Sequence, residues 1–197
     1  MGNNYLNTEF VDRAIKFAVD AHANTERRGK GFPYVIHVME AMEIVASITN
    51  DPELLAAAAL HDTVEDTDIT VEQVRAEFGD RVARLVDSET TEMIAGMTET
   101  ESWRMRRLSS IARLRNASRD AKIVAIGDKL SNMRAIAQDY RRIGDELWKR
   151  FHAPKGKEDY AWYYQQLGEA LADLSDTDAH IEYCELYHKV FDWDLLL

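Results

Sequence analysis

The sequence predicts an all-α fold, and three observations lead to this class. Apolar residues recur every three or four positions along most segments, as on one face of an amphipathic helix. No segment shows the apolar/polar alternation of a half-buried β-strand. The prolines, Pro33, Pro52 and Pro154, each fall where the helical periodicity breaks. At 197 residues the chain has the length of one domain with a good-sized core, so we predict a single domain.

The composition is that of an ordinary water-soluble protein, with 46% hydrophobic and 30% charged residues. No stretch approaches the ~18 uninterrupted apolar residues of a membrane span, and the first residues lack the pattern of a secretion signal. We therefore expect a cytoplasmic protein with no membrane partner. Cys184 is the single cysteine, which excludes an internal disulfide and a thiolate cluster. A bound metal would have nitrogen and oxygen ligands.

The formal net charge of -11 argues against a nucleic acid polymer as partner, because contacts to many phosphates need a basic face. A small phosphorylated ligand stays open. It would need a metal ion and a local basic pocket within an acidic protein.

The first predicted helix opens at Thr8 and Glu9 and keeps the 3.6-residue period as far as His22. A histidine at the edge of an apolar face is more often a structural hydrogen-bonding group than a ligand. We therefore place His22 outside the candidate site.

A cationic loop separates the first helix from the second. Residues 24–34 hold two glycines, a proline and three basic residues, among them Arg28 and Lys30. A solubilising loop is one interpretation, and a ligand-binding loop is the other, because the loop directly precedes His37. That histidine lies in the first turn of a helix predicted over about 35–49.

An alanine-rich helix after Pro52 ends in the polar run around which the chain is organised. If this helix continues, as its Ala and Leu content predicts, four polar side chains three or four positions apart share one face. Burial of such a face is costly unless a positive charge lies opposite, and a divalent cation is the simplest candidate. The alternative is a solvated helix end. The four side chains are those of His61, Asp62, Glu65 and Asp66.

Two short helices and a loop are expected next. Thr70 and Gln73 form a capping box for a helix that ends near Gly79, and Asp80 starts another. Residues 88–101 are rich in Thr and Glu and show no clear period, so we predict a loop, which could gate the site.

A basic helix over residues 102–116 and a buried helix over 121–134 are predicted to follow. In the buried helix, Asp128 and Asn132 are four residues apart and share a face. A buried aspartate is rare without a partner, and either Arg134 or a metal could serve Asp128.

Lys155 and Lys157 precede an aromatic run that begins at Tyr160. Such a run beside lysines could stack a base and bind phosphate, although core packing is expected for at least two of the rings. The helix predicted over about 176–190 serves packing. The apolar tail, residues 191–197, leaves docking onto the chain and a homo-oligomer contact open.

The separated polar groups form one candidate metal site on predicted helices. Two imidazoles and two carboxylates suit Mn, Fe or Zn, and ligand type alone does not choose among them. The candidate ligands are His37, His61, Asp62 and Asp128.

This arrangement resembles the HD phosphohydrolase superfamily, in which a His…His-Asp…Asp pattern binds a catalytic divalent metal in a helical bundle. Longer stretches are similar to the hydrolase domain of RelA/SpoT proteins, above all to stand-alone small alarmone hydrolases of the metazoan SpoT-homologue type. The resemblance covers about residues 8–175 and leaves a C-terminal packing helix and tail, 176–197. The stretches that carry it are residues 28–37, 58–67, 78–79 and 127–134.

The resemblance implies a single-domain HD-type helical bundle that uses Mn²⁺ and releases pyrophosphate from the 3′ position of (p)ppGpp, a guanosine-3′,5′-bis(diphosphate) 3′-pyrophosphohydrolase activity. In this chemistry a metal polarises a phosphoryl oxygen and lowers the pKa of a bound water. Glu65 and Asp66 are the acidic pair that we assign to orienting and deprotonating that water. The expected substrate contacts are Arg28, Lys30, Asn132, Lys155, Lys157 and Tyr160.

The chain departs from the family pattern at several positions. Gly29 stands where a lysine commonly follows the arginine, Gly127 replaces the alanine before the metal aspartate, and Val38 replaces a proline. The lost lysine leaves the base preference open. One alternative is therefore the same metal core acting on another nucleotide, such as the NADPH 2′-phosphate or an adenosine-based 3′-phosphate. A second is a catalytically idle nucleotide-sensing domain, which has no physical need for both Glu65 and Asp66.

Overall fold

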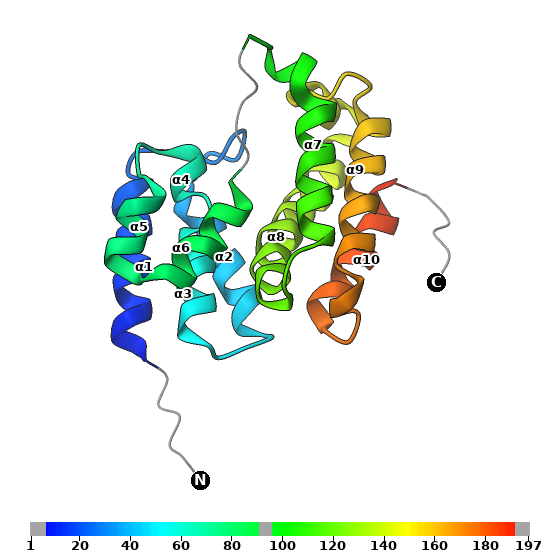
Figure 1. Cartoon of the computed structure of the whole chain (residues 1–197). Coiled ribbons are helices and arrows are strands. Elements are labelled where there is room, and N and C mark those ends of the chain that lie inside the picture. Colours follow the sequence, from blue (N-terminus) through cyan, green and yellow to red (C-terminus); the bar gives the residue numbers. More distant parts are fainter. Residues whose placement is uncertain (1–6, 91–95, 192–197) are drawn as a thin grey trace. The chain divides into compact units, whose positions relative to one another are not determined.

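The computed structural model describes residues 7–90 and 96–191, and its regular structure is helical (Figure 1). Within these residues no strand occurs, and an isolated antiparallel bridge joins Glu26 to Pro33. The all-α prediction is confirmed. Backbone contacts group the chain into two compact units, here called unit 1 (residues 1–90 and 123–128) and unit 2 (91–122 and 129–197). The single-domain organisation stays a prediction.

Unit 1 is assembled around one helix that is buried over most of its length. Its helices are α1 (Thr8–Ala21), α2 (Val35–Ala46), α3 (Pro52–Leu60), α4 (Thr63–Asp66), α5 (Val71–Phe78) and α6 (Asp80–Glu89). The central helix is α3, which packs against α1, α2 and α6 (Figure 1). Every side chain from Leu54 to Leu60 is buried. Four of these residues are alanines, and such small side chains let the neighbouring helices approach closely.

The helix starts of unit 1 follow local sequence signals. At α5 the predicted capping box is present, because the Gln73 amide N–H donates to the Thr70 hydroxyl (3.2 Å) and the Thr70 amide donates to the Gln73 side chain (2.8 Å). At α1 the cap is Asn7, whose side chain accepts from the Phe10 amide (3.1 Å). The Asp51 carboxylate caps α3 in the same way. Each cap satisfies an amide that the helix itself leaves unpaired.

Unit 2 has a core rich in aromatic rings. Its elements are α7 (Glu99–Arg115), most of α8 (Arg119–Ile143), the 3-10 helix η1 (Gly144–Arg150), α9 (Lys157–Ala170), the 3-10 helix η2 (Ala172–Leu174) and α10 (Asp178–Phe191). Helix α9 packs against α7 and α10. Tyr160, Tyr163 and Tyr164 are buried, which confirms the core role expected for at least two of the rings.

The prediction of a loop over residues 88–101 is wrong at both ends. Helix α6 continues to Glu89, and α7 already begins at Glu99. The reason at the second end is a capping box that the sequence analysis missed, in which Thr98 and Glu101 bond each other's backbone amides. Residues 91–95 of this segment, like residues 192–197 of the apolar tail, lie outside the described residues.

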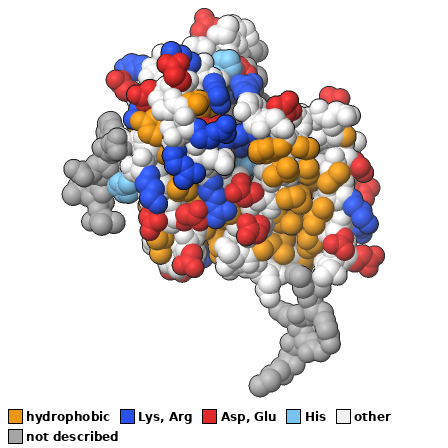
Figure 2. All heavy atoms as spheres, turned by 180° about the vertical axis from the view of Figure 1, so that it is seen from behind, with side chains coloured by type: hydrophobic (Ala, Val, Ile, Leu, Met, Phe, Trp, Pro, Cys, Tyr) orange, Lys and Arg blue, Asp and Glu red, His pale blue; other side chains and the backbone are white. Residues whose placement is uncertain are grey.

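The face displayed in Figure 2 carries acidic and basic side chains interspersed, beside an area of hydrophobic side chains. In the ranges 7–90 and 96–191, no helix has both the length and the apolar character needed to cross a membrane.

Candidate metal centre

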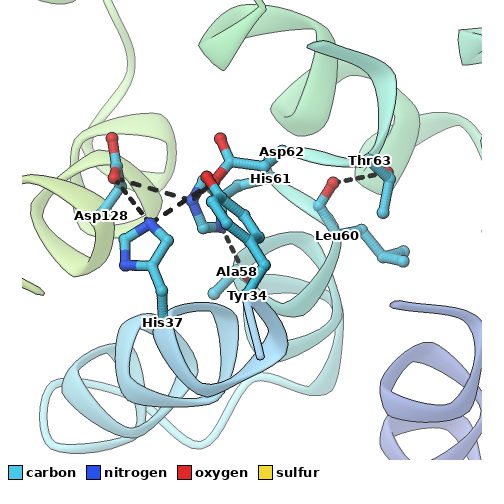
Figure 3. Close-up of polar contacts among 8 residues, drawn as sticks. All are labelled: Tyr34, His37, Ala58, Leu60, His61, Asp62, Thr63 and Asp128. Carbon is cyan, nitrogen blue, oxygen red and sulfur yellow. Dashed lines mark hydrogen bonds and ion pairs between the residues drawn. The ribbon is translucent and has the colours of Figure 1, made fainter. Parts of the chain in front are cut away.

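Four polar side chains converge in unit 1 (Figure 3). His37 comes from the first turn of α2, His61 and Asp62 follow the end of α3, and Asp128 lies on the segment of α8 that belongs to this unit. One ligand atom from each of the four lies within 4.8 Å of the others. Both histidines are almost fully buried, at 3% and 1% exposure. The four residues therefore form a nitrogen and oxygen cluster of the size that one ion requires.

Figure 3 shows both imidazoles turned toward the carboxylates. His37 Nε2 lies 3.4 Å from Asp62 Oδ2 and 3.3 Å from Asp128 Oδ1. The corresponding distances from His61 Nε2 are 2.8 Å and 3.7 Å. The two rings meet edge to face, with centroids 5.2 Å apart.

The helix that was predicted to run through this motif is interrupted, so that prediction is wrong. Helix α3 ends at Leu60, and the chain turns at His61 and Asp62 before α4 begins at Thr63. The Thr63 hydroxyl donates to the Leu60 carbonyl (2.7 Å), and such local side-chain bonds compete with helix continuation. In a continuous helix, consecutive side chains point about 100° apart. Here His61 Nε2 and Asp62 Oδ2 lie 2.8 Å apart.

The hydrogen bond at His61 Nδ1 determines the protonation of the other ring nitrogen, Nε2, which faces this cluster. His61 Nδ1 lies 2.8 Å from the Ala58 carbonyl oxygen, which can only accept, so Nδ1 carries the proton. In the neutral ring, Nε2 then presents a lone pair to the Asp62 and Asp128 carboxylates. Nε2 is buried without a hydrogen-bond partner among the described residues. Lone pairs this close repel each other unless a proton or a metal ion lies between them, and the residues therefore fit a divalent metal.

The pKa shifts of His61 and Asp62 also indicate that the cluster favours a positive charge. Burial opposes protonation of His61, but the Asp62 and Asp128 carboxylates outweigh it and raise the pKa of the imidazole well above its ordinary value. Burial likewise works against ionisation of Asp62. Interactions with His61 and His37 outweigh it and hold the pKa of this carboxyl far below its usual range.

Tyr34 is a contact of the centre that sequence reasoning missed. Its hydroxyl donates to Asp62 Oδ2 at 2.7 Å, the same oxygen that faces both imidazoles. Burial and the nearby Asp62 and Asp66 charges raise the pKa of this phenol well above 10, so it stays a donor. A signal was available, because Tyr34 precedes His37 by three residues, about one helical turn.

Gly127 explains how α8 reaches α2. A Cβ atom at this position would lie 2.6 Å from the Ala41 carbonyl oxygen and 2.9 Å from a Val45 methyl. The departure from alanine noted in the sequence thus permits a closer helix contact than alanine allows, immediately beside Asp128.

The predicted acidic pair lies on α4, directly after the metal motif. Glu65 and Asp66 are both exposed. Partial burial and the Asp62 charge raise the pKa of Asp66, which makes its carboxylate a stronger proton acceptor than an isolated aspartate.

The two predicted substrate contacts of unit 1 lie in the loop before α2. Arg28 is exposed and Lys30 is half-buried. Gly29 and Gly31 have φ of 70° and 71°, in the left-handed region that favours glycine. A lysine at position 29 would be strained, so the backbone itself accounts for this departure from the family pattern.

The other predicted substrate contacts belong to unit 2. Lys155 is exposed, whereas the Lys157 ammonium donates to the Tyr140 hydroxyl (2.8 Å). Tyr160 is 7% exposed and packs against the rings of Trp103, Trp148 and Phe151. Asn132 lies on α8 and is half-buried.

The sequence left Arg134 or a metal open as the partner of Asp128. Arg134 makes two 2.7 Å bonds to the Glu182 carboxylate, and Asp128 faces the two histidines.

The chain belongs to the HD domain family, whose model matches residues 14–157. Among curated proteins it is similar to the guanosine-3′,5′-bis(diphosphate) 3′-pyrophosphohydrolase MESH1 of Danio rerio, with 32% identity over 183 residues, 91% of this chain and 92% of that protein. The human MESH1 is 31% identical over 173 residues, 86% of this chain and 87% of that protein. The resemblance drawn from the motifs is confirmed.

A longer relative shares the same region. A probable guanosine-3′,5′-bis(diphosphate) 3′-pyrophosphohydrolase of Synechocystis is 32% identical over 174 residues, 84% of this chain but 22% of that protein. The chain thus spans a small part of this relative.

Solved structures share the fold. A metazoan SpoT orthologue, described as hydrolysing ppGpp, superposes with a TM-score of 0.72 at 23% identity over 91% of this chain and 94% of that chain. A Listeria monocytogenes protein gives a TM-score of 0.69 at 28% identity over 80% of this chain and 99% of that chain.

Proposed function

We propose that this protein is a metal-dependent hydrolase that removes the 3′-pyrophosphate from (p)ppGpp-like alarmones. The observation that carries the proposal is the cluster of two imidazoles and two carboxylates, in a chain whose relatives of similar length are ppGpp pyrophosphohydrolases by name. His37, His61, Asp62 and Asp128 would hold the ion. A divalent ion bound there would polarise a phosphoryl oxygen and lower the pKa of a coordinated water.

Glu65 and Asp66 supply the proton acceptor for this hydrolysis. Both side chains reach solvent and follow Asp62 by one turn. We assign the deprotonation of the attacking water to this pair, and the raised pKa of Asp66 supports a basic role.

Cationic side chains would bind the substrate, Arg28 near its base or ribose and the lysines at its phosphates. Exposed Arg28 and half-buried Lys30 sit in a loop whose glycine turns shape its backbone, and exposed Lys155 offers a further charge. Asn132 and Lys157 stay in the proposal as polar contacts. Tyr160 would have to leave ring contacts in the core of unit 2 to stack on a base, so we assign it the smallest share of binding.

Manganese as the native ion is part of the proposal, because a mixed nitrogen and oxygen set with two carboxylates suits Mn²⁺, as it also suits Fe and Zn. A cytoplasmic location and a homo-oligomer stay predictions from the sequence.

The test is a Mn²⁺-supplemented reaction with ppGpp, in which released GDP and pyrophosphate are measured. We expect turnover by the native chain and none by Asp128→Asn, which keeps the side-chain shape and removes a ligand charge. Glu65→Gln should bind Mn²⁺ normally and turn over about 10²–10⁴-fold more slowly. The matched control is Asp12→Asn, an exposed carboxylate on α1 outside the cluster. Native turnover by Asp128→Asn would refute the proposal.

A second candidate substrate class is favoured by one observation. The left-handed backbone at Gly29 would strain the lysine that commonly follows the arginine near the base. Parallel reactions with pGpp, ppApp and NADPH therefore accompany ppGpp. A higher kcat/KM for ppApp or NADPH would transfer the same chemistry to an adenine nucleotide.

A further inference from the structure

His22 is a buried histidine of unit 1 that the proposed reaction does not use. It caps the C-terminal end of α1, where its backbone N–H donates to the Ala18 carbonyl (3.0 Å). The residue is 3% exposed. Neither ring nitrogen has a hydrogen-bond partner within the described part of the chain. Because no such bond orients the ring, its packing contacts must do so.

The principal ring contact of His22 is Tyr34. The two ring centroids are 5.0 Å apart and the planes are inclined by 34°, a tilted arrangement. The Tyr34 and His37 rings also meet edge to face, with centroids 5.5 Å apart, and the Arg27 guanidinium lies 5.2 Å from the Tyr34 centroid. The phenol ring thus contacts three neighbouring side chains, and its hydroxyl is the group that donates to Asp62.

The Asp62 oxygen that Tyr34 contacts is the critical one. Oδ2 accepts the 2.7 Å bond from the phenol and lies 2.8 Å from His61 Nε2. Partners of this kind orient metal-binding carboxylates, and their loss typically weakens metal binding about 10–100-fold. A change in the tilt of the Tyr34 ring therefore moves the carboxylate that faces both imidazoles.

We propose that His22 is a positioning residue of the metal centre, which acts through Tyr34 by fixing the tilt of the phenol that donates to Asp62. The inference goes beyond the proposed function, on whose metal site it rests. It revises the placement of His22 outside the site. Burial lowers the pKa of His22, which keeps a second positive charge away from the place where the cation would bind.

The experiment measures Co²⁺ binding and the visible spectrum of the bound Co²⁺, a probe of the geometry around the ion that needs no substrate. His22→Ala removes the ring that packs against Tyr34, and we expect about tenfold weaker Co²⁺ binding with a changed spectrum, as for Tyr34→Phe. His22→Phe keeps an aromatic ring against Tyr34 and should bind Co²⁺ within about twofold of the native chain. The double variant His22→Ala/Tyr34→Phe should bind Co²⁺ no more weakly than the single variant with the lower affinity. Both changes interrupt the same series of contacts, so their effects should not add.

The matched control is Phe17→Ala. Phe17 also lies on α1, and its substitution removes a ring contact with Phe78, whose centroid is 5.4 Å away. Neither residue belongs to the cluster. It should lower the thermal midpoint of the metal-free protein and leave the Co²⁺ spectrum unchanged, which separates positioning from general destabilisation.

If the native chain binds Co²⁺, any one of three results would overturn the inference. His22→Ala could keep the native Co²⁺ affinity and spectrum, or His22→Phe could lose as much Co²⁺ affinity as His22→Ala. The third result is a double variant in which the two losses of affinity multiply. A native chain that binds no divalent ion at all would instead remove the proposed function, and this inference with it.

Discussion

The two units of this protein bury their helices with different kinds of side chain. In unit 1 the central helix α3 presents Ala56 to Ala59, each at most 1% exposed, to the helices around it. In unit 2 large rings fill the space, as where Trp148 stacks on Tyr160 at 5.8 Å and on Phe191 at 5.4 Å. Small residues bring backbones together, whereas rings hold them apart and fill the gap with contact area.

This difference in side-chain size explains why the polar cluster lies in unit 1. The four side chains of the candidate metal site are short or medium in length and start from α2, from the turn after α3 and from α8, so these segments must approach closely for the side chains to meet. Alanines in α3 and Gly127 in α8 permit that approach. Cations lie over rings in both units, with Arg27 at 5.2 Å from the Tyr34 centroid in unit 1 and Arg104 at 3.4 Å from the Trp162 centroid in unit 2.

The largest expected effect tests the ring-filled core. Trp103 is 1% exposed and contacts the rings of Tyr160 and Tyr163. Trp103→Ala should lower the free energy of unfolding by about 3–5 kcal/mol, through lost burial and the cavity left behind. Urea unfolding followed by circular dichroism measures this. The folded fraction should bind Co²⁺ with native affinity, and a matching loss of affinity would show that the centre depends on the rings of unit 2.

Removal of the metal is expected to act on unit 1. At a free Mn²⁺ concentration a hundredfold above Kd, binding should stabilise the native chain by about 2.7 kcal/mol. Calorimetry with Mn²⁺ and with a chelator measures the difference. The Asp128→Asn variant should show no such difference, and an equal gain there would place the metal elsewhere.

Gly127→Ala tests the close approach of α8 to α2. The added Cβ would meet backbone at 2.6 Å, so we expect a loss of about 1–3 kcal/mol in stability together with weaker Co²⁺ binding. The matched control is Gly168→Ala in unit 2, where a Cβ would meet the Tyr183 ring at 3.2 Å, a milder conflict with a side chain. Metal affinity should change in the first variant and not in the second.

The smallest expected effect is the loss of stability when a helix capping box is removed, and it should be similar in both units. Each has a capping box, at Thr70 with Gln73 in unit 1 and at Thr98 with Glu101 in unit 2. Thr70→Ala and Thr98→Ala should each lower the free energy of unfolding by about 1 kcal/mol without changing Co²⁺ affinity. Thermal denaturation compares them, and a much larger loss in one variant would reveal a role beyond capping.

Local signals made most helix starts predictable. Thr8, Pro52 and Asp80 each begin a helix as expected, because caps and first-turn residues act within one turn of chain. The Thr98 capping box was equally readable but was hidden in a segment without apolar period. The metal cluster was predictable from residue type and from the resemblance, whereas propensity wrongly extended α3 through His61 because the Thr63 hydroxyl bond lies outside any propensity scale.

By itself, the sequence determined the helical class, most helix starts and the residue types of the centre, since these follow from periodicity, capping and the donor atoms that a metal accepts. Only the tertiary structure decided which groups meet: Tyr34 with Asp62, His22 with Tyr34, and Gly127 with the backbone of α2. The physical reason is that such contacts join residues far apart in the chain. Their geometry depends on how closely whole helices pack, which no local pattern contains.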